Sequence, residues 1–115
     1  MIDLDGLLIP ILGRDVVVFE VSDDDMVQDD LNDGLFCHET FIISIRKSIT
    51  NDDYKMRCLA HELGHAFIYR AGLCDSLDDK SEECLAECIG NLLIESFGVD
   101  KKWVKSLHRI QELLK

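Results

Sequence analysis

The pentapeptide His61-Glu62-Leu63-Gly64-His65 constrains this chain more than any other feature. It lies in a segment whose apolar residues recur at helical spacing, and a helix turns by about 100° per residue. His61 and His65 are then about 40° apart around the axis and one turn apart along it, so both imidazoles can bind one metal ion. Glu62 points about 60° away from His65, which makes it a poor ligand but places its carboxylate where a general base belongs. The pattern predicts a metal-binding helix with hydrolytic chemistry.

The length and net charge of the chain limit the number of domains and the kinds of partner that it can bind. The chain has 115 residues, 47% of them hydrophobic, which is enough for one core and too little for two ordinary domains. We therefore expect residues 1–115 to form a single domain. The formal net charge of −11 repels phosphate backbones, which argues against direct nucleic-acid binding and favours a basic protein partner or substrate.

The cellular location is predicted from what the chain lacks. No apolar run approaches the length of about 20 residues that spans a bilayer, and the first residues carry no basic secretion signal. The five cysteines are an odd number without a Cys-x-x-Cys pair, which is typical of reduced thiols. We expect a cytoplasmic protein without membrane contact.

The residues before the pentapeptide are patterned as strands and turns. The β-branched and aromatic run at 16–21 predicts a strand, whereas Pro10 limits residues 7–12 to a short edge strand or an irregular segment. The aspartate-rich stretch at 22–34 is expected to be a solvated loop.

A hairpin is predicted for residues 35–45, because two apolar clusters flank a polar centre. Ile43 and Ile45 share one face of its second strand, so this strand is expected to cover a helix. The fold predicted from these elements is α+β, with a short antiparallel sheet packed on the helix that carries the histidines. An extended substrate is expected to pair with the edge of the strand at 41–45.

Three helices are predicted from residue 50 onward. Thr50 and Asp53 resemble a capping box before the first helix, and Gly72 marks its expected end. The second helix is expected from about 81 to 97, and a third C-terminal helix from 101 to 114. The residues expected on the buried side of the second helix are Leu85, Cys88, Ile89, Leu92 and Leu93.

A catalytic zinc ion usually has three protein ligands, so the two histidines need a partner. Ala71 stands where the long metzincin pattern requires a third histidine, which excludes that class. The second helix opens with three glutamates, of which Glu83 is the favoured third ligand and Glu82 the alternative. Glu87 shares a helix face with Glu83, so it can accept the free ring N–H of a ligating histidine.

From about residue 16 to residue 93 the chain resembles the ImmA/IrrE family of zinc metallopeptidases. The resemblance consists of a strand, a hairpin, the sequence His-Glu-Leu-Gly-His, and then E-x-x-A-E-x-I-G-x-x-L at 83–93. The family typically has E-x-x-A-N-x-F-A there, followed by a leucine pair and often Met-Pro. These departures leave the ligand set unchanged and affect the residues that would surround a substrate.

This resemblance implies a gluzincin-like zincin domain, with zinc on His61, His65 and Glu83 and with Glu62 as the catalytic base. Family members often lie beside helix-turn-helix repressors in mobile elements and prophages, and some cleave such repressors. The implied activity is hydrolysis of a peptide bond in a specific intracellular protein, with a basic DNA-binding repressor as the candidate substrate. Two alternatives stay open, namely a non-catalytic zinc-containing regulatory module and a binding component of a toxin–antitoxin pair.

Overall fold

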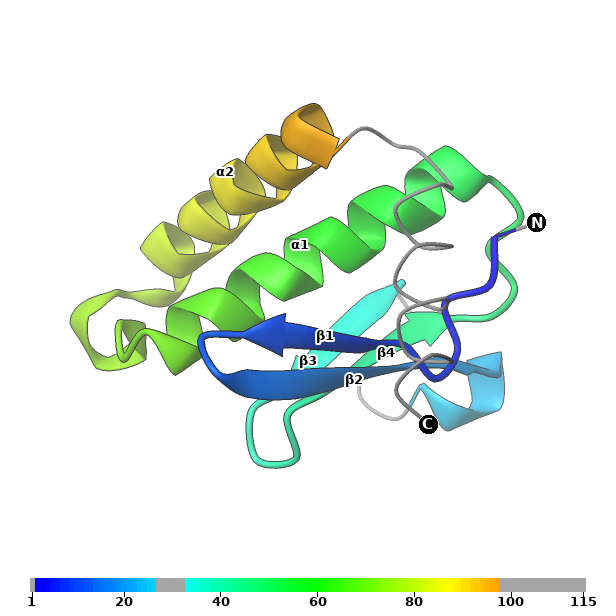
Figure 1. The fold of residues 1–115 in the computed structure, drawn as a ribbon, viewed down its shortest axis with the longest axis horizontal. Helices are drawn as coiled ribbons and strands as arrows, with labels where there is room; N and C mark the ends of the chain where they lie inside the picture. The colour runs from blue at the N-terminus through cyan, green and yellow to red at the C-terminus, as the bar shows by residue number, and fades with distance from the viewer. Residues whose placement is uncertain (1, 27–32, 98–115) are drawn as a thin grey trace.

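The computed structural model describes residues 2–26 and 33–97, which form a four-stranded sheet and two long helices. Helix α1 (Asp52–Arg70) covers one face of the sheet, and helix α2 (Asp79–Phe97) packs on α1 on the side away from the sheet (Figure 1). This arrangement confirms the predicted α+β class. None of the helices in these residues combines the length and hydropathy that crossing a membrane requires.

The sheet is mixed, which corrects the prediction of an antiparallel sheet. Its strand order is β1-β2-β4-β3, with β1 (Leu8–Ile11) antiparallel to β2 (Arg14–Val21) and β3 (Gly34–Cys37) antiparallel to β4 (Ile42–Arg46). The central strands β2 and β4 are parallel. The second hairpin docks through β4 because its isoleucines, rather than the half-buried residues of β3, belong in the middle of the sheet.

This strand order also overturns the expected substrate edge. β4 is bonded to a strand on either side, so its backbone groups are already paired. The edge strand next to it is β3, which was predicted only as the first half of the hairpin. The other edge strand is β1, so of the two structures that Pro10 left open for residues 7–12, the edge strand is the one formed.

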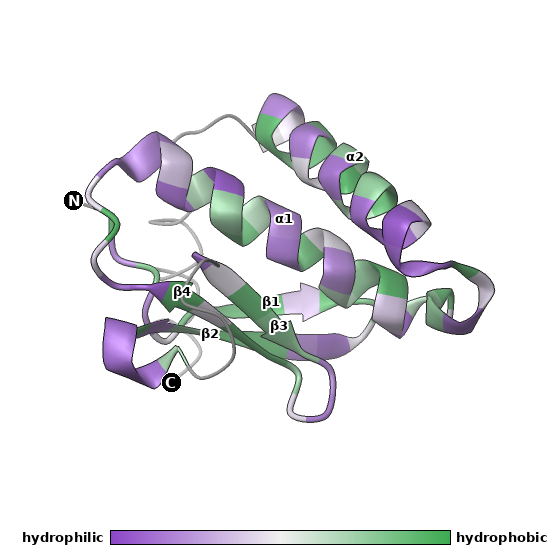
Figure 2. Ribbon diagram, turned by 180° about the vertical axis from the view of Figure 1, so that it is seen from behind, coloured by the Kyte–Doolittle hydropathy of each residue, from purple (hydrophilic) through white to green (hydrophobic). Residues whose placement is uncertain are grey.

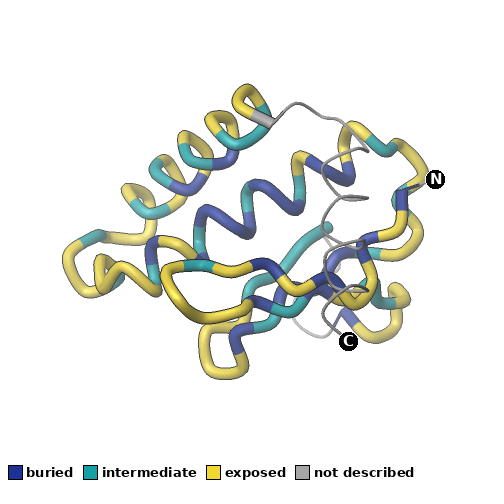
Figure 3. Tube along the Cα trace, in the orientation of Figure 1, coloured by how far each residue is buried: buried dark blue, intermediate teal, exposed yellow. Residues whose placement is uncertain are grey.

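The core lies between α1 and the inner face of the sheet. Side chains alternate between the two faces along β2 and β4, and Val16, Val18, Ile43 and Ile45 on the face toward the helix are fully buried. Figure 2 shows the hydrophobic strands beneath α1, and Figure 3 shows buried positions along the helix itself. The residues that meet in this layer include Val16, Val18, Ile43, Ile45, Leu59 and Leu63.

Helix α1 begins one residue later than the capping box predicted. Asn51, not Thr50, is the N-cap, and its side chain accepts a hydrogen bond of 2.9 Å from the backbone N–H of Tyr54. At the other end, Gly72 has a φ of 76° and lets the chain leave the helix, as expected.

Helix α2 exposes residues that were predicted to be buried. Cys88 is exposed, and Leu92 is 62% exposed. The sequence prediction was wrong here because α2 packs on α1 through one narrow stripe, which leaves the rest of its surface to solvent (Figure 3). The third helix, predicted at 101–114, lies outside the described residues.

One buried charge was not anticipated. Lys55 on α1 is 1% exposed and forms an ion pair with Glu20 of β2. The Lys55 ammonium group also donates to the Ile2 carbonyl at 3.4 Å, and Glu20 accepts the Leu4 backbone N–H at 2.8 Å. These contacts attach the N-terminal segment to the sheet and to α1.

Candidate metal centre

The middle of α1 presents the histidine pair to a cleft between α2 and the edge strand β3. His61 and His65 are four residues apart on α1 and their ring centroids lie 4.9 Å apart. Their side chains are 25% and 13% exposed, so both rings are largely shielded but still reached by solvent. The two residues therefore share one helix face, as the spacing predicted.

Small residues let α2 approach α1 closely at this level. A Cβ atom at Gly64 would lie 2.5 Å from the Ala86 carbonyl oxygen and 2.9 Å from the Ala86 Cα, distances that no real Cβ occupies. One turn earlier along α1, Gly90 of α2 lies against the Ala60 backbone, where a Cβ would meet atoms at 3.1 Å. The helices run antiparallel, and their close approach brings the glutamates of α2 within reach of the imidazoles of α1.

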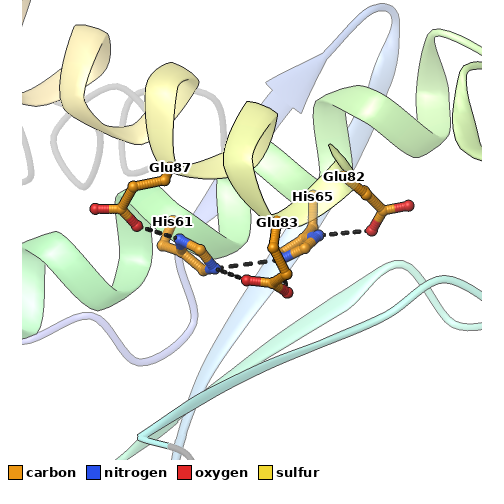
Figure 4. Close-up of polar contacts among 5 residues, drawn as sticks. All are labelled: His61, His65, Glu82, Glu83 and Glu87. Atoms are coloured by element: carbon orange, nitrogen blue, oxygen red, sulfur yellow. Dashed lines mark hydrogen bonds and ion pairs between the residues drawn. The ribbon is translucent and has the colours of Figure 1, made fainter. Parts of the chain in front are cut away.

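Glu83 lies across both histidines (Figure 4). Its Oε2 is 3.1 Å from His61 Nε2, and its Oε1 is 3.0 Å from His65 Nε2. The two Nε2 atoms are 3.3 Å apart. The residue favoured by sequence as the third ligand is therefore in the place that a ligand requires.

Glu87 and Glu82 contact the Nδ1 atoms of the two rings, which face away from Glu83 (Figure 4). Glu87 Oε2 accepts from His61 Nδ1 at 2.8 Å, which is the partner role assigned to it from sequence. Glu82 Oε2 accepts from His65 Nδ1 at 2.8 Å. Sequence reasoning kept Glu82 only as an alternative ligand and missed this role, although its position beside Glu83 on the first turns of α2 was a usable signal.

These contacts can be compared with what a zinc ion needs. An imidazole that donates its Nδ1–H to Glu87 or Glu82 and carries no proton on Nε2 presents the lone pair of that nitrogen, which is the form that binds a metal ion. A tetrahedral ion with bonds of about 2.0–2.1 Å requires ligand atoms about 3.3 Å apart. The two Nε2 atoms are 3.3 Å apart, which matches this distance. The Glu83 contacts of 3.1 and 3.0 Å involve its two different oxygens, so the carboxylate as a group lies within reach of both nitrogens.

The donor set agrees with the geometry. His61, His65 and Glu83 offer one ligand atom each within 4.8 Å of one another. Two imidazoles and a carboxylate are typical ligands of catalytic zinc, and carboxylates bonded to the second ring nitrogen are the usual support. The residues present therefore fit a divalent metal ion.

Glu62 lies on the inner side of the same cleft. It is 9% exposed, and burial raises the pKa of its carboxyl group, while the nearby His65 and His61 and a backbone hydrogen bond from Phe36 lower it in part. Gly34 of β3 lies against the side chain, since a Cβ there would be 3.1 Å from Glu62 Cγ. The absence of a side chain at residue 34 leaves room for the carboxylate.

The cleft has a volume of about 880 Å³ and extends along α1 between the start of α2 and β3. Tyr54 and Cys58 line it on the N-terminal side of the histidines. Tyr69 and His38 line it on the C-terminal side. Tyr54, Tyr69 and His38 can each donate a hydrogen bond into this cleft.

Comparison with protein-family models, curated proteins and solved structures found no match to this chain. The candidate site is accordingly defined by its own geometry.

Proposed function

We propose that this protein is a zinc-dependent metallopeptidase of the ImmA/IrrE type. One observation carries the proposal: His61, His65 and Glu83 each offer a ligand atom within 4.8 Å of the others, in the cleft that Glu62 also lines. Two imidazoles, one carboxylate ligand and an adjacent unliganded glutamate are the parts that peptide hydrolysis by zinc uses.

His61, His65 and Glu83 would hold the ion, and Glu82 and Glu87 would fix the orientation of the rings. A zinc ion bound there would polarise the scissile carbonyl and lower the pKa of a water molecule. Glu62 accepts a proton from the attacking water and passes it to the departing amine. The largely buried position of Glu62 keeps its carboxylate from being fully hydrated.

The substrate binds as an extended chain along β3. This strand is the sheet edge beside the cleft, and Gly34, Leu35 and Phe36 line the cleft. Backbone pairing at such an edge holds a peptide without demanding a particular sequence. A chain paired there passes the histidines and Glu62.

The proposed substrate is a specific intracellular protein, and a basic helix-turn-helix repressor is the leading candidate. The resemblance to the ImmA/IrrE family supports this choice. The net charge of −11 supports it as well, because an acidic surface attracts a basic partner.

The test compares the native chain with Glu62→Gln, using metal analysis and cleavage of a repressor encoded beside it. The native chain is expected to bind one zinc ion and cleave. Glu62→Gln is expected to keep the zinc and to lose about 10²–10⁴-fold in kcat, the range for losing a general base. Glu95→Gln is the matched control, since Glu95 is an exposed residue of α2, and it should cleave like the native chain.

Two results would contradict the proposal. A native chain that binds no zinc when supplied with it would remove the metal site. A Glu62→Gln variant that cleaves at the native rate would remove the assigned base. Stoichiometric zinc together with repressor binding and no cleavage in either protein would instead support the non-catalytic regulatory module.

A further inference from the structure

Peptide hydrolysis needs a hydrogen-bond donor for the oxygen that becomes negatively charged in the transition state. Water adds to the carbonyl carbon, and the carbonyl π electrons move onto that oxygen. The C–N bond then breaks, the carbonyl forms again, and the amine leaves with the proton taken up by Glu62. The cleft contains four side chains that can donate to this oxygen: Arg57, Tyr54, Tyr69 and His38.

Tyr54 is already engaged. Its hydroxyl donates to the Asp33 carboxylate, and this hydrogen bond is the largest cause that raises the pKa of the Tyr54 phenol. Tyr54 and Arg57 also precede His61 on α1, and helical side chains lean toward the N-terminus of their helix. Both therefore lean away from the histidines.

Tyr69, unlike Tyr54 and Arg57, follows the histidines on α1. It follows His65 by four residues on α1, so it shares the face of the histidines and leans back toward them. Three rings hold it in position, with centroid distances of 5.2 Å to His38, 6.2 Å to Phe36 and 6.3 Å to Phe41. A ring fixed on several sides keeps its hydroxyl in place without a hydrogen bond.

The hydroxyl of Tyr69 is available to a ligand. Within residues 2–26 and 33–97 it has no hydrogen-bond partner, whereas the other cleft tyrosine does. Over the same residues no buried side-chain oxygen or nitrogen lacks a partner, so the Tyr69 hydroxyl is accessible to solvent, and Tyr69 is one of the residues that line the cleft. A solvent-accessible hydroxyl on a ring held in a cleft wall is suited to a substrate atom.

We propose that the Tyr69 hydroxyl donates a hydrogen bond to the oxyanion of the peptide undergoing hydrolysis. It touches the reacting carbonyl oxygen and keeps its own proton throughout. The proposal rests on the proposed metallopeptidase function and adds one catalytic residue to it. His38 acts only through its packing against the Tyr69 ring.

The first test is Tyr69→Phe, which keeps the ring and removes only the hydroxyl. Loss of one oxyanion donor typically lowers kcat by about 10²–10³-fold, and we expect a loss in this range with little change in KM or zinc content. Tyr54→Phe is the matched control, because it removes a cleft hydroxyl that is bonded to Asp33, and its kcat should stay near the native value.

A second readout does not depend on turnover. Zinc-loaded native chain and Tyr69→Phe are titrated with a phosphinic peptide, which carries a tetrahedral anion like the transition state, and with a mercaptoacyl peptide, which does not. Tyr69→Phe should bind the phosphinic peptide at least tenfold more weakly and the mercaptoacyl peptide equally well. A difference confined to the phosphinic peptide, whose tetrahedral oxygens mimic the oxyanion, identifies a donor to the oxyanion rather than a change in the fold.

The proposal is overturned if the two proteins bind the phosphinic peptide equally, or if Tyr69→Phe cleaves at the native rate. It is also overturned if Tyr54→Phe loses as much kcat as Tyr69→Phe. These results differ from failure of the proposed function, which shows as absent zinc or as cleavage by Glu62→Gln. If Tyr69→Phe cleaves at the native rate and Glu62→Gln is inactive, the role of Tyr69 is disproved and the proposed peptidase function is not.

Discussion

At the scale of single residues, the histidines depend on the carboxylates behind them. A carboxylate bonded to Nδ1 fixes which ring nitrogen carries the proton and increases the basicity of the other. Glu87 does this for His61 and Glu82 for His65, both at 2.8 Å. Each ring is thus positioned by a residue outside the proposed ligand set of His61, His65 and Glu83.

Glu82→Ala and Glu87→Ala are each expected to weaken zinc binding by about 10–100-fold, the usual effect of removing such a partner. Competition with a chromogenic chelator measures this affinity directly. Glu95→Ala on the same helix is the control and should bind zinc like the native chain. Unchanged affinity in both Glu82→Ala and Glu87→Ala would show that the rings are held by other means.

The cysteines give a prediction that depends on pH. Hydrogen bonds from Thr40 lower the pKa of the exposed Cys37 thiol, whereas burial raises the pKa of the Cys58 thiol. A lower pKa means more thiolate at a given pH, and the thiolate is the reactive form. Cys37 should therefore react with iodoacetamide at lower pH than a free thiol, and Cys58 only at higher pH.

Mass spectrometry of alkylated peptides over about pH 6–10, a range that spans the ordinary thiol pKa, would follow each cysteine separately. Cys84 and Cys88 are exposed on α2 and serve as the internal reference. If Cys58 reacted at lower pH than these two, its thiol would not be buried as described.

At the scale of elements, the site depends on how closely α2 approaches α1. Gly64→Ala would place a methyl group 2.5 Å from the Ala86 carbonyl oxygen, so the helices must separate. Overpacking of this kind costs about 1–3 kcal/mol, and separation also moves the α2 glutamates away from the imidazoles. We expect Gly64→Ala to lower the free energy of unfolding by that amount and to weaken zinc binding.

Two further variants sharpen this prediction. Gly90→Ala meets backbone atoms at 3.1 Å and should be milder than Gly64→Ala. Adding Ala86→Gly to Gly64→Ala should not restore stability, because the clash is with the Ala86 backbone. Urea denaturation measures stability in each case. Rescue by Ala86→Gly would mean that side chains, not the backbone, set the distance between the helices.

Periodicity predicted the elements well and their arrangement poorly. The helix carrying the histidines, the second helix and the hairpin follow from local patterns, and the spacing of the histidines and glutamates follows from helix geometry. The parallel pairing of β2 and β4 does not, because it depends on contacts between distant segments. The apolar residues of α2 were predicted to be buried, but Leu92 is exposed. Helical spacing of apolar residues therefore does not show whether another element packs against them.

The candidate site shows the same division. His61, Glu62 and His65 follow from one helix and were readable from spacing. The role of Glu82 required the relative position of two helices, which α2 takes up because residues 64 and 86 are small. The spacing of residues in the sequence determines which side chains of one helix share a face. The packing of the two helices determines which side chains of α2 reach that face.

At the scale of the whole molecule, a buried ion pair joins three parts of the chain. Lys55 of α1 and Glu20 of β2 form it, and both also bond to the N-terminal segment through Ile2 and Leu4. The side chains are 1% and 10% exposed, so neither charge is well hydrated. Removing one partner of a buried pair costs about 3–5 kcal/mol, because the other charge stays buried without compensation.

Lys55→Met and Glu20→Gln are therefore each expected to lower the free energy of unfolding by roughly 3 kcal/mol. The double variant should lose clearly less than the sum, because it leaves no unpaired buried charge, and the amide introduced by Glu20→Gln can still accept the Leu4 N–H. Asp23→Asn is the control, since Asp23 pairs with Arg46 at the surface with 59% of its side chain exposed, and it should change stability little.

Chemical denaturation of the native chain, the two single variants and the double variant gives the coupling energy between Lys55 and Glu20. Zinc affinity measured on the folded protein should not change, because the pair lies nearly two turns of α1 before His61 and outside the cleft lining. Additive losses would mean that the two charges act independently. A parallel loss of zinc affinity in folded Lys55→Met would mean that the N-terminal attachment positions the metal centre as well as the fold.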